Sequence, residues 1–459
     1  MGTSVATTVA PLVSSGEESD GTCDPRRRLG VPPVPTVTGT IDAPPSPPPA
    51  VGRSGGAAEP RALLSSSPPN PWTDLVARGR PLLRPACYFL LSRLAVLAAA
   101  LIATSMFPRL RVFHAMGTVW DGRWYLSIAQ HGYPHHLFNE GDGSRWAFFP
   151  GFPAAVRALA EVTRLDLPDA AVVAAFVLGL TSALAIWLAV REVFGSRLAE
   201  RAVLLYVFCP TAYVLSLAYT EGLFLTAAAT CLYALSRRYW ITAALCACVA
   251  GLTRNAGIVV VLAVLVMALP AAWRGRTWRP VVAASIAPLG LVSFMAYGWA
   301  MVGTPVAFLS AERFWHGQHF VWFESPIGAI VVALHQGPGG VGFLPAAMAG
   351  ASLVLGFLGI WLLDRMSGSV RTGGGAIAAV PTSWWVYTVG TLLIAYSAYF
   401  TDSIPRYTMA AFPLFVAFAW KLPRSMEGAV VGVMACLQGA LLVAVISSAV
   451  HPMAAPIVP

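Results

Sequence analysis

The sequence predicts an all-α polytopic membrane protein, and three observations support this fold class. Hydrophobic residues occupy 57% of the 459 positions, whereas charged residues occupy only 11%. Apolar runs of membrane-spanning length recur from about residue 86 to residue 450. No stretch between these runs is charged enough to form an independent soluble domain. Any chemistry or transport must therefore be carried out by the spans and the loops that connect them.

The first 80 residues are predicted to form a disordered cytoplasmic tail. They are rich in Pro, Ser, Gly and Thr and lack a repeating apolar face, so they cannot bury enough surface to fold. We expect residues 81–459 to form the transmembrane domain. The first apolar core starts near Cys87, which is too late for a cleaved signal peptide, and the first span is therefore expected to be an uncleaved anchor.

Basic clusters between the apolar runs predict the order of the spans. Arg and Lys gather in cytoplasmic loops, so the net charge of +9 indicates membrane topology rather than a nucleic-acid surface. Span one covers about 86–106 and span two about 170–190; spans three and four turn at 219–221, five and six at 254–255, and span seven covers about 281–301. Four more spans follow. This gives a bundle of about 11 transmembrane helices in the plasma membrane, with the N-terminus cytoplasmic and the C-terminus outside.

Spans three to six are shorter than the roughly 20 residues that a perpendicular helix needs. We therefore expect one or two of them to be broken or re-entrant. Two large extracytoplasmic connections, 107–168 and 302–340, should carry short interfacial helices, one of them over 152–165. Loops of this length are usually functional. The same topology places these polar residues on the outer face: Asp121, Glu140, Asp142, Arg145, Glu221, Arg254, Glu312, His316, His319, Glu324, Asp402 and Arg406.

Asp121 is the strongest catalytic candidate. It lies in Trp-Asp-Gly-Arg-Trp-Tyr (120–125), at the predicted outer end of span one. A carboxylate is costly to place at a membrane boundary and is useful there mainly for chemistry or binding. A general base that deprotonates an acceptor hydroxyl needs such a group. The alternative is an aromatic belt in which Asp121 caps the helix that follows.

Two arginines and one glutamate on the same face are further candidates. Arg254 or Arg406 could hold the departing phosphate of a lipid-linked sugar and stabilise its developing charge. Each could instead be a snorkelling arginine or an ion-pair partner of Glu221 or Asp402. Glu221 could orient acceptor hydroxyls or Arg254, or could simply cap a hairpin.

His316 and His319 have the spacing of residues that share a helix face. A metal site, contacts to sugar or phosphate, and no chemical role at all are the three interpretations. A lipid phosphate is already an activated leaving group, so we expect neither a metal nor a cofactor. Trp124 and Tyr125 could stack on sugar rings, although aromatic belts at membrane surfaces use the same residue types.

Four segments, taken in order, resemble the PIG-V-like mannosyltransferases, which are polytopic GT-C glycosyltransferases that use lipid-phosphate-linked sugars. The resemblance covers about residues 86 to 450. The segments are Trp-Asp-Gly-Arg-Trp-Tyr-Leu-Ser-Ile-Ala (120–129) with Gly132-Tyr133 and Ala-Phe-Phe-Pro (147–150), residues 210–224, residues 252–257, and Ser-Ile-Pro-Arg-Tyr (403–407) with Pro413.

The resemblance implies that Asp121 takes the place of the family's catalytic aspartate. The donor would be polyprenyl-phosphate mannose, the reaction an inverting single displacement, and the acceptor a lipid-linked or cell-envelope glycan. The single lysine and the heavy use of Ala, Arg, Gly and Pro indicate a high-GC, actinobacterial source, so the family's eukaryotic acceptor does not carry over. The expected substrate-binding residues are Trp120, Arg123, Trp124, Tyr125, Tyr219, Glu221, Arg254, Asn255, His316, His319, Arg406 and Tyr407.

A transporter or flippase of a lipid-linked sugar is the alternative from a different class. It would explain many spans and polar residues without chemistry. Transporters tend to have internal repeats and polar sites near the bilayer midplane, whereas this sequence has no evident repeat and its polar residues gather at one face. An envelope scaffold that has lost its activity is a third interpretation.

Overall fold

The computed structural model describes residues 71–107, 110–138, 144–275, 277–316, 323–337, 342–367, 370–371, 377–397 and 401–450. The chain divides into two units, 1–67 and 68–459, and the described residues belong to the second. The predicted tail lies outside the described residues as far as residue 70. The first helix begins at Pro71, before the predicted boundary at residue 81.

The regular elements of the first part of the domain are all helices among its described residues. Its helices are α1 (Pro71–Ser105), α2 (Val112–Thr118), α3 (Gly122–His131), the 3₁₀ helix η1 (Arg145–Ala147), α4 (Gly151–Thr163), α5 (Leu167–Phe194), α6 (Ser196–Phe208), the 3₁₀ helix η2 (Pro210–Ser216), α7 (Glu221–Ser236), α8 (Trp240–Thr253) and α9 (Gly257–Gly275).

The second part adds one short hairpin, in which β1 (Val370–Arg371) pairs antiparallel with β2 (Ile377–Ala378). Its helices are α10 (Trp278–Ile286), α11 (Leu289–Val302), α12 (Ala307–His316), α13 (Glu324–Gln336), α14 (Phe343–Met366), α15 (Thr382–Tyr396), the 3₁₀ helix η3 (Thr401–Ser403), α16 (Ile404–Ala410), α17 (Pro413–Lys421) and α18 (Arg424–Val450).

Among the described residues, six segments are long and apolar enough to cross a membrane. They are Pro81–Ser105, Leu167–Phe194, Gly257–Gly275, Trp278–Val302, Phe343–Met366 and Arg424–Ala449. The pair α6 and η2, bent by 81°, makes a seventh if it counts as one span. The other predicted spans correspond to α7, α8, α15 and the broken pair α16–α17, which are too short to qualify by length. The fold class is confirmed, whereas the number eleven stays a prediction.

The bend between α6 and η2 fulfils the expectation of a broken span. Pro210 begins η2, and because proline lacks an N–H it cannot continue the hydrogen-bond ladder of α6. Side chains from two other helices bind the carbonyl groups released at the break. Arg93 of α1 donates to the carbonyl oxygens of Val207 (3.1 Å) and Ala212 (2.8 Å), and Gln438 of α18 donates to those of Val207 (3.1 Å) and Cys209 (3.0 Å). Broken helices are tolerated at membrane depth when protein groups satisfy the backbone in this way.

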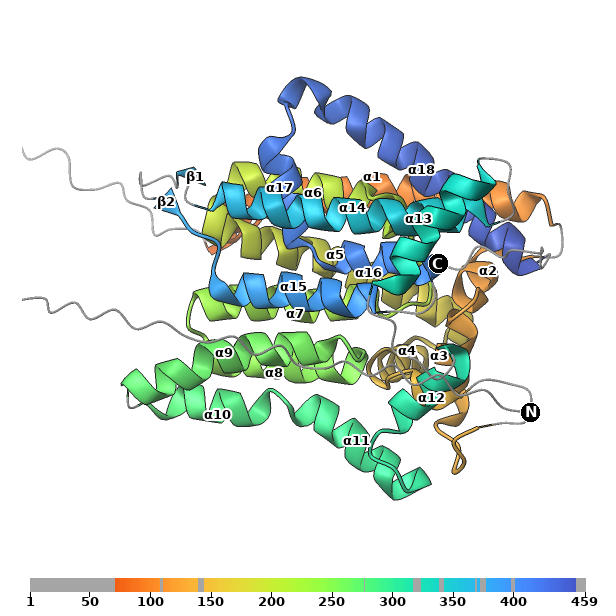
Figure 1. Cartoon of the computed structure of the whole chain (residues 1–459), viewed down its shortest axis with the longest axis horizontal. Coiled ribbons are helices and arrows are strands. Elements are labelled where there is room, and N and C mark those ends of the chain that lie inside the picture. The colour runs from red at the N-terminus through yellow and green to blue at the C-terminus, as the bar shows by residue number, and fades with distance from the viewer. Residues whose placement is uncertain are drawn as a thin grey trace, which may run out of the picture. The chain divides into compact units, whose positions relative to one another are not determined.

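The segments predicted to face outward gather at one end of the helical bundle. Figure 1 shows α2, α3, α4 and α12 at this end, with the β1–β2 hairpin and the α9–α10 turn at the opposite end. The predicted amphipathic stretch 152–165 corresponds closely to α4. Hence the loops that carry the candidate residues are neighbours in space, as the alternation of basic and polar loops predicts.

Close packing between α5 and α7 fixes the first turn of α7. A Cβ atom on Gly222 would lie 2.9 Å from the backbone nitrogen of Gly179, so only a residue without a side chain fits there. Small residues let membrane helices approach this closely. This contact places Glu221, the first residue of α7, inside the bundle end with an exposed fraction of only 1%.

Candidate active site

Asp121 lies in a strained turn between α2 and α3. Trp120 has a left-handed backbone (φ 48°), which costs a bulky residue roughly 1–2 kcal/mol and tends to occur at functional sites. Asp121 is at the N-cap position of α3, but its side chain makes no capping hydrogen bond. Its backbone N–H donates to the hydroxyl of Tyr219 at 3.3 Å. The capping interpretation of this carboxylate is therefore not supported, and its side chain has another partner.

That partner is Arg406 of α16. Its Nη2 atom donates to Oδ2 of Asp121 at 2.9 Å. The guanidinium lies 4.9 Å from the ring centroid of Tyr219 and 5.0 Å from that of Tyr407, so two aromatic faces hold it in place. Arg406 is 7% exposed and Asp121 is 22% exposed. Asp121 is thus the accessible member of the pair, and Arg406 supports it from behind.

Glu221 and Arg254 extend this pair into a four-membered network. Arg254 follows the last residue of α8, and its Nη1 atom donates to Oε1 of Glu221 at 3.0 Å. The same glutamate oxygen is 3.8 Å from Nε of Arg406. The guanidinium of Arg254 lies 4.6 Å from the ring centroid of Tyr407. We call Asp121, Glu221, Arg254 and Arg406 the charge network.

The charge network contains two carboxylates and two guanidiniums, so its formal charges cancel. Such compensation is needed because an unpaired charge in a water-poor site is strongly unfavourable. Three buried atoms of the network nevertheless make no hydrogen bond within the described residues: Oε2 of Glu221, Nε of Arg254 and Nε of Arg406. Unsatisfied buried polar atoms are uncommon and call for an explanation, such as a bound ligand or water.

Both arginines proposed as phosphate ligands are therefore already engaged by carboxylates. Arg254 is 12% exposed and Arg406 is 7% exposed. Each still has an Nε–H without a hydrogen-bond partner among the described residues, so a substrate phosphate would share the guanidinium with its carboxylate. The ion-pair alternative that the sequence left open is the arrangement observed: Arg254 pairs with Glu221, and Arg406 pairs with Asp121 and lies 3.8 Å from Glu221.

Glu312 joins the site although it was not among the expected binding residues. Asn255 donates from Nδ2 to Oε1 of Glu312 at 3.0 Å, and its own Oδ1 accepts from the N–H of Ala256 at 2.7 Å. Glu312 is on α12, which packs through Phe308 on the aromatic cluster around Trp146. Burial raises the pKa of Glu312 to about 7, and nearby Arg254 opposes this shift. The sequence feature that could have identified Glu312 as a site residue was its position as an acidic residue in a long, predicted outer loop.

The raised pKa of Glu312 predicts a pH-dependent stability. The folded state binds the proton more tightly than the unfolded state, so this contribution is fully present below about pH 4.5 and is lost as pH rises towards 7. We expect Glu312→Gln to match the wild-type unfolding temperature at pH 4 and to exceed it by a few degrees at pH 8. The control is Glu161→Gln, whose carboxylate is exposed and paired with Arg157 on one face of α4. A Glu312→Gln difference that does not vary with pH would contradict the assignment.

The aromatic residues after Asp121 serve mainly to pack α3. Tyr125 is buried, with ring centroid distances of 5.2 Å to Phe148, 5.7 Å to Phe152 and 6.4 Å to Tyr219. Trp124 stacks on Phe148 at 5.8 Å, and Arg123 lies over the Trp124 ring at 5.7 Å. Arg123 itself is exposed. This arrangement explains the aromatic spacing by packing, whereas sugar contacts from Trp124 and Tyr125 stay a prediction.

The two histidines are not brought into the charge network by any described contact. The side chain of His316 and all of His319 lie outside the described residues. Among the residues that the structure does describe, no group of three His, Cys, Asp or Glu side chains could hold a metal ion.

A family model provides one comparison with known proteins. The model described as "Dolichyl-phosphate-mannose-protein mannosyltransferase" matches residues 150–299, about a third of the chain. This part includes Glu221, Arg254 and Asn255 but neither Asp121 nor Arg406. No curated protein sequence matches the chain.

Three solved structures of an oligosaccharyltransferase from Archaeoglobus fulgidus are similar to the chain, and the chain spans about half of their length. The complex with zinc and sulfate has 14% identity and a TM-score of 0.42 over 77% of this chain and 53% of that one. The form tethered to an acceptor peptide has 14% identity and a TM-score of 0.38 over 78% and 55%. The AglB complex with an inhibitory peptide and a dolichol-phosphate has 12% identity and a TM-score of 0.35 over 80% and 56%.

The similarity to a mannosyltransferase family thus covers residues 150–299, within a helical fold that has six candidate membrane spans among its described residues.

Proposed function

We propose that this protein is an integral membrane mannosyltransferase of the PIG-V-like type. It transfers mannose from polyprenyl-phosphate mannose to a lipid-linked or cell-envelope glycan on the outer face of the plasma membrane. The donor is supported by the matching family model, whose description names dolichyl-phosphate-mannose.

One observation carries this proposal: the hydrogen-bonded ion pair between Asp121 and Arg406. These residues are 285 positions apart in the chain, and Tyr219 contacts both of them. All three belong to segments that the resemblance identified from sequence alone. An aromatic belt without a chemical role would not require three segments, distant in the sequence, to place side chains around one carboxylate.

The arrangement favours a single displacement with Asp121 as the general base. Asp121 accepts the proton of an acceptor hydroxyl, and the hydroxyl oxygen attacks the anomeric carbon of the donor mannose. The bond from that carbon to the phosphate oxygen breaks, its electron pair leaves with the phosphate, and polyprenyl phosphate departs. Attack opposite the leaving group inverts the anomeric configuration. Arg406 keeps the accessible carboxylate of Asp121 oriented while this happens.

The proposal can be tested by comparing cells with and without the gene. We expect deletion to remove one mannosylated lipid or envelope glycan, and the wild-type gene to restore it. Purified protein supplied with the accumulated acceptor should use polyprenyl-phosphate mannose in preference to the corresponding glucose and arabinose lipids. An unchanged glycan profile, or equal use of all three donors, would contradict the proposal.

The predicted orientation can be tested by labelling introduced cysteines. All seven native cysteines are first replaced, and a single cysteine is placed at His135, in the first long connection, or at Arg197, at the start of α6. Both positions are exposed. We expect an impermeant thiol reagent to label the cysteine at position 135 in whole cells and the one at position 197 only after the cells are opened. The reverse pattern would invert the topology.

A further inference from the structure

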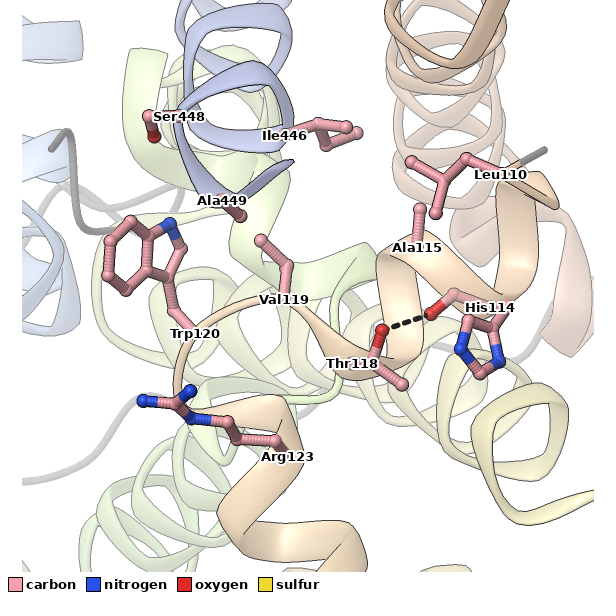
Figure 2. Close-up of a pocket in the computed structure, with 10 residues that line it drawn as sticks. All are labelled: Leu110, His114, Ala115, Thr118, Val119, Trp120, Arg123, Ile446, Ser448 and Ala449. Atoms are coloured by element: carbon pink, nitrogen blue, oxygen red, sulfur yellow. Dashed lines mark hydrogen bonds between the residues drawn. The ribbon is translucent and has the colours of Figure 1, made fainter. Parts of the chain in front are cut away.

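A cavity of about 410 Å³ borders the turn that carries Asp121. It lies between α2, the α2–α3 turn and the last turns of α18, and its size is within the range of small-ligand sites. Figure 2 shows Trp120 and Arg123 on one side of it and His114 on the other, with Ile446 and Ala449 of α18 facing them. Neither the family model, which covers residues 150–299, nor the charge network accounts for this cavity.

The cavity presents positive charge beside an apolar wall. Its ten lining residues include Arg123 and His114 but no Asp or Glu. The only partner found for the guanidinium of Arg123 within the described residues is the ring of Trp124, so its hydrogen-bond donors are available. An anion fits beside Arg123, because an arginine binds phosphate through charge-assisted hydrogen bonds.

The apolar residues of the lining fit a hydrocarbon chain. They are Leu110, Val119, Ile446 and Ala449, and α18 is poorly buried, with 28% of its most apolar window inside the protein. A chain that leaves the cavity along α18 therefore meets a surface suited to lipid. A ligand with an anionic head and an apolar tail can contact both the cationic and the apolar residues of the lining. A free anion would leave the apolar residues without a contact.

We propose that this cavity binds the phosphate and the first isoprene units of a polyprenyl-phosphate lipid, with Arg123 as its phosphate ligand. This inference rests on the proposed function and assigns the phosphate to Arg123 instead of the ion-paired Arg254 and Arg406. Since Trp120 and Arg123 flank Asp121 in the sequence, the bound phosphate lies next to the turn that presents the base. Trp120, whose backbone is left-handed, belongs to the lining beside Val119 (Figure 2).

The test measures binding of radiolabelled decaprenyl phosphate to the full chain in nanodiscs, with decaprenol and inorganic phosphate as comparison ligands. We expect the wild type to prefer decaprenyl phosphate over decaprenol by about tenfold or more. Arg123→Gln should remove this preference, and Ala449→Trp, which fills the cavity from an exposed position, should weaken binding of both lipids. The matched controls are Arg157→Gln, an exposed arginine of α4, and Val433→Trp, an exposed position on α18, and both should bind like the wild type.

Three other results of this binding test would overturn the cavity assignment, and they differ in what they imply for the proposed function. Wild-type binding by folded Arg123→Gln and Ala449→Trp would overturn the cavity assignment and leave the proposed function standing if mannose transfer persists. Displacement of the lipid by millimolar inorganic phosphate would indicate a plain anion site and would also overturn it. Failure of the wild type both to bind decaprenyl phosphate and to transfer mannose would overturn the proposed function together with this inference.

Discussion

Asp121→Asn is expected to reduce mannose transfer by a factor of about 10² to 10⁴, the usual contribution of a positioned general base. The amide cannot accept the proton of the acceptor hydroxyl. Its oxygen can still accept the hydrogen bond from Nη2 of Arg406, which is 2.9 Å from Oδ2 in the wild type, so the protein should insert and fold. Initial rates with saturating donor and acceptor measure the loss, and thermal unfolding in detergent checks the fold.

Asp169 of α5 offers a closely matched control. Its side chain is 22% exposed, the same fraction as Asp121, and it also faces an arginine, Arg111, at 3.9 Å. Arg111, however, is 77% exposed and belongs to no buried cluster. Asp169→Asn should therefore leave transfer near the wild-type rate. Similar losses in the two variants, or near-normal transfer by folded Asp121→Asn, would remove Asp121 from the chemistry.

Arg406→Ala should combine the largest loss of stability with a loss of transfer. Removing one partner of a buried ion pair leaves uncompensated charge and costs about 3–5 kcal/mol. Here Asp121 and Glu221 would both lose a cation, and Asp121 would lose its orientation. Arg406→Lys keeps the charge, but a single ammonium cannot reproduce the contacts made separately by Nη2 and Nε. We expect Arg406→Lys to be more stable than Arg406→Ala yet still impaired in transfer.

The control for this pair of variants is Arg84→Ala. Arg84 is 69% exposed and forms a salt bridge with Glu200 at 2.9 Å, the same distance as that between Arg406 and Asp121. Surface pairs contribute about 0–1 kcal/mol because water and salt screen them. The loss of unfolding free energy in Arg406→Ala should be several times the loss in Arg84→Ala. If Arg406→Ala cost no more than Arg84→Ala, the charge network could not be the structural centre of the site.

Several features of the fold and the site could be predicted from the sequence because they depend on local chemistry. The apolar runs predicted the span positions, and the basic loops placed the polar loops at the same end of the bundle. The short length of spans three to six predicted a broken span, and the structure shows a bend of 81° between α6 and η2. The members of the charge network could be named as candidates from their motifs. Charged residues are rare in the apolar sequence of a membrane protein, so each one at a predicted span end is easily recognised.

The pairings within the site could not be predicted, because they depend on how distant helices pack. Four polar segments on one face allow several combinations. The sequence left Glu221 and Asp402 as possible partners of the two arginines, and it did not indicate that Arg406 also pairs with Asp121. Glu312 reaches Asn255 only because α12 folds back onto the aromatic cluster around Trp146. The cavity between α2 and α18 likewise joins residues from opposite ends of the domain, for which no local pattern exists.

The most direct test of the account is a stoichiometric measurement on purified protein in sealed proteoliposomes. Donor labelled separately in its mannose and its lipid is supplied with the acceptor fraction from cells lacking the gene. The account predicts one released polyprenyl phosphate for each mannose transferred, and release of both products slowed by the same factor of about 10² to 10⁴ with Asp121→Asn. Movement of intact polyprenyl-phosphate mannose across the membrane without cleavage would contradict it and would identify the protein as a transporter.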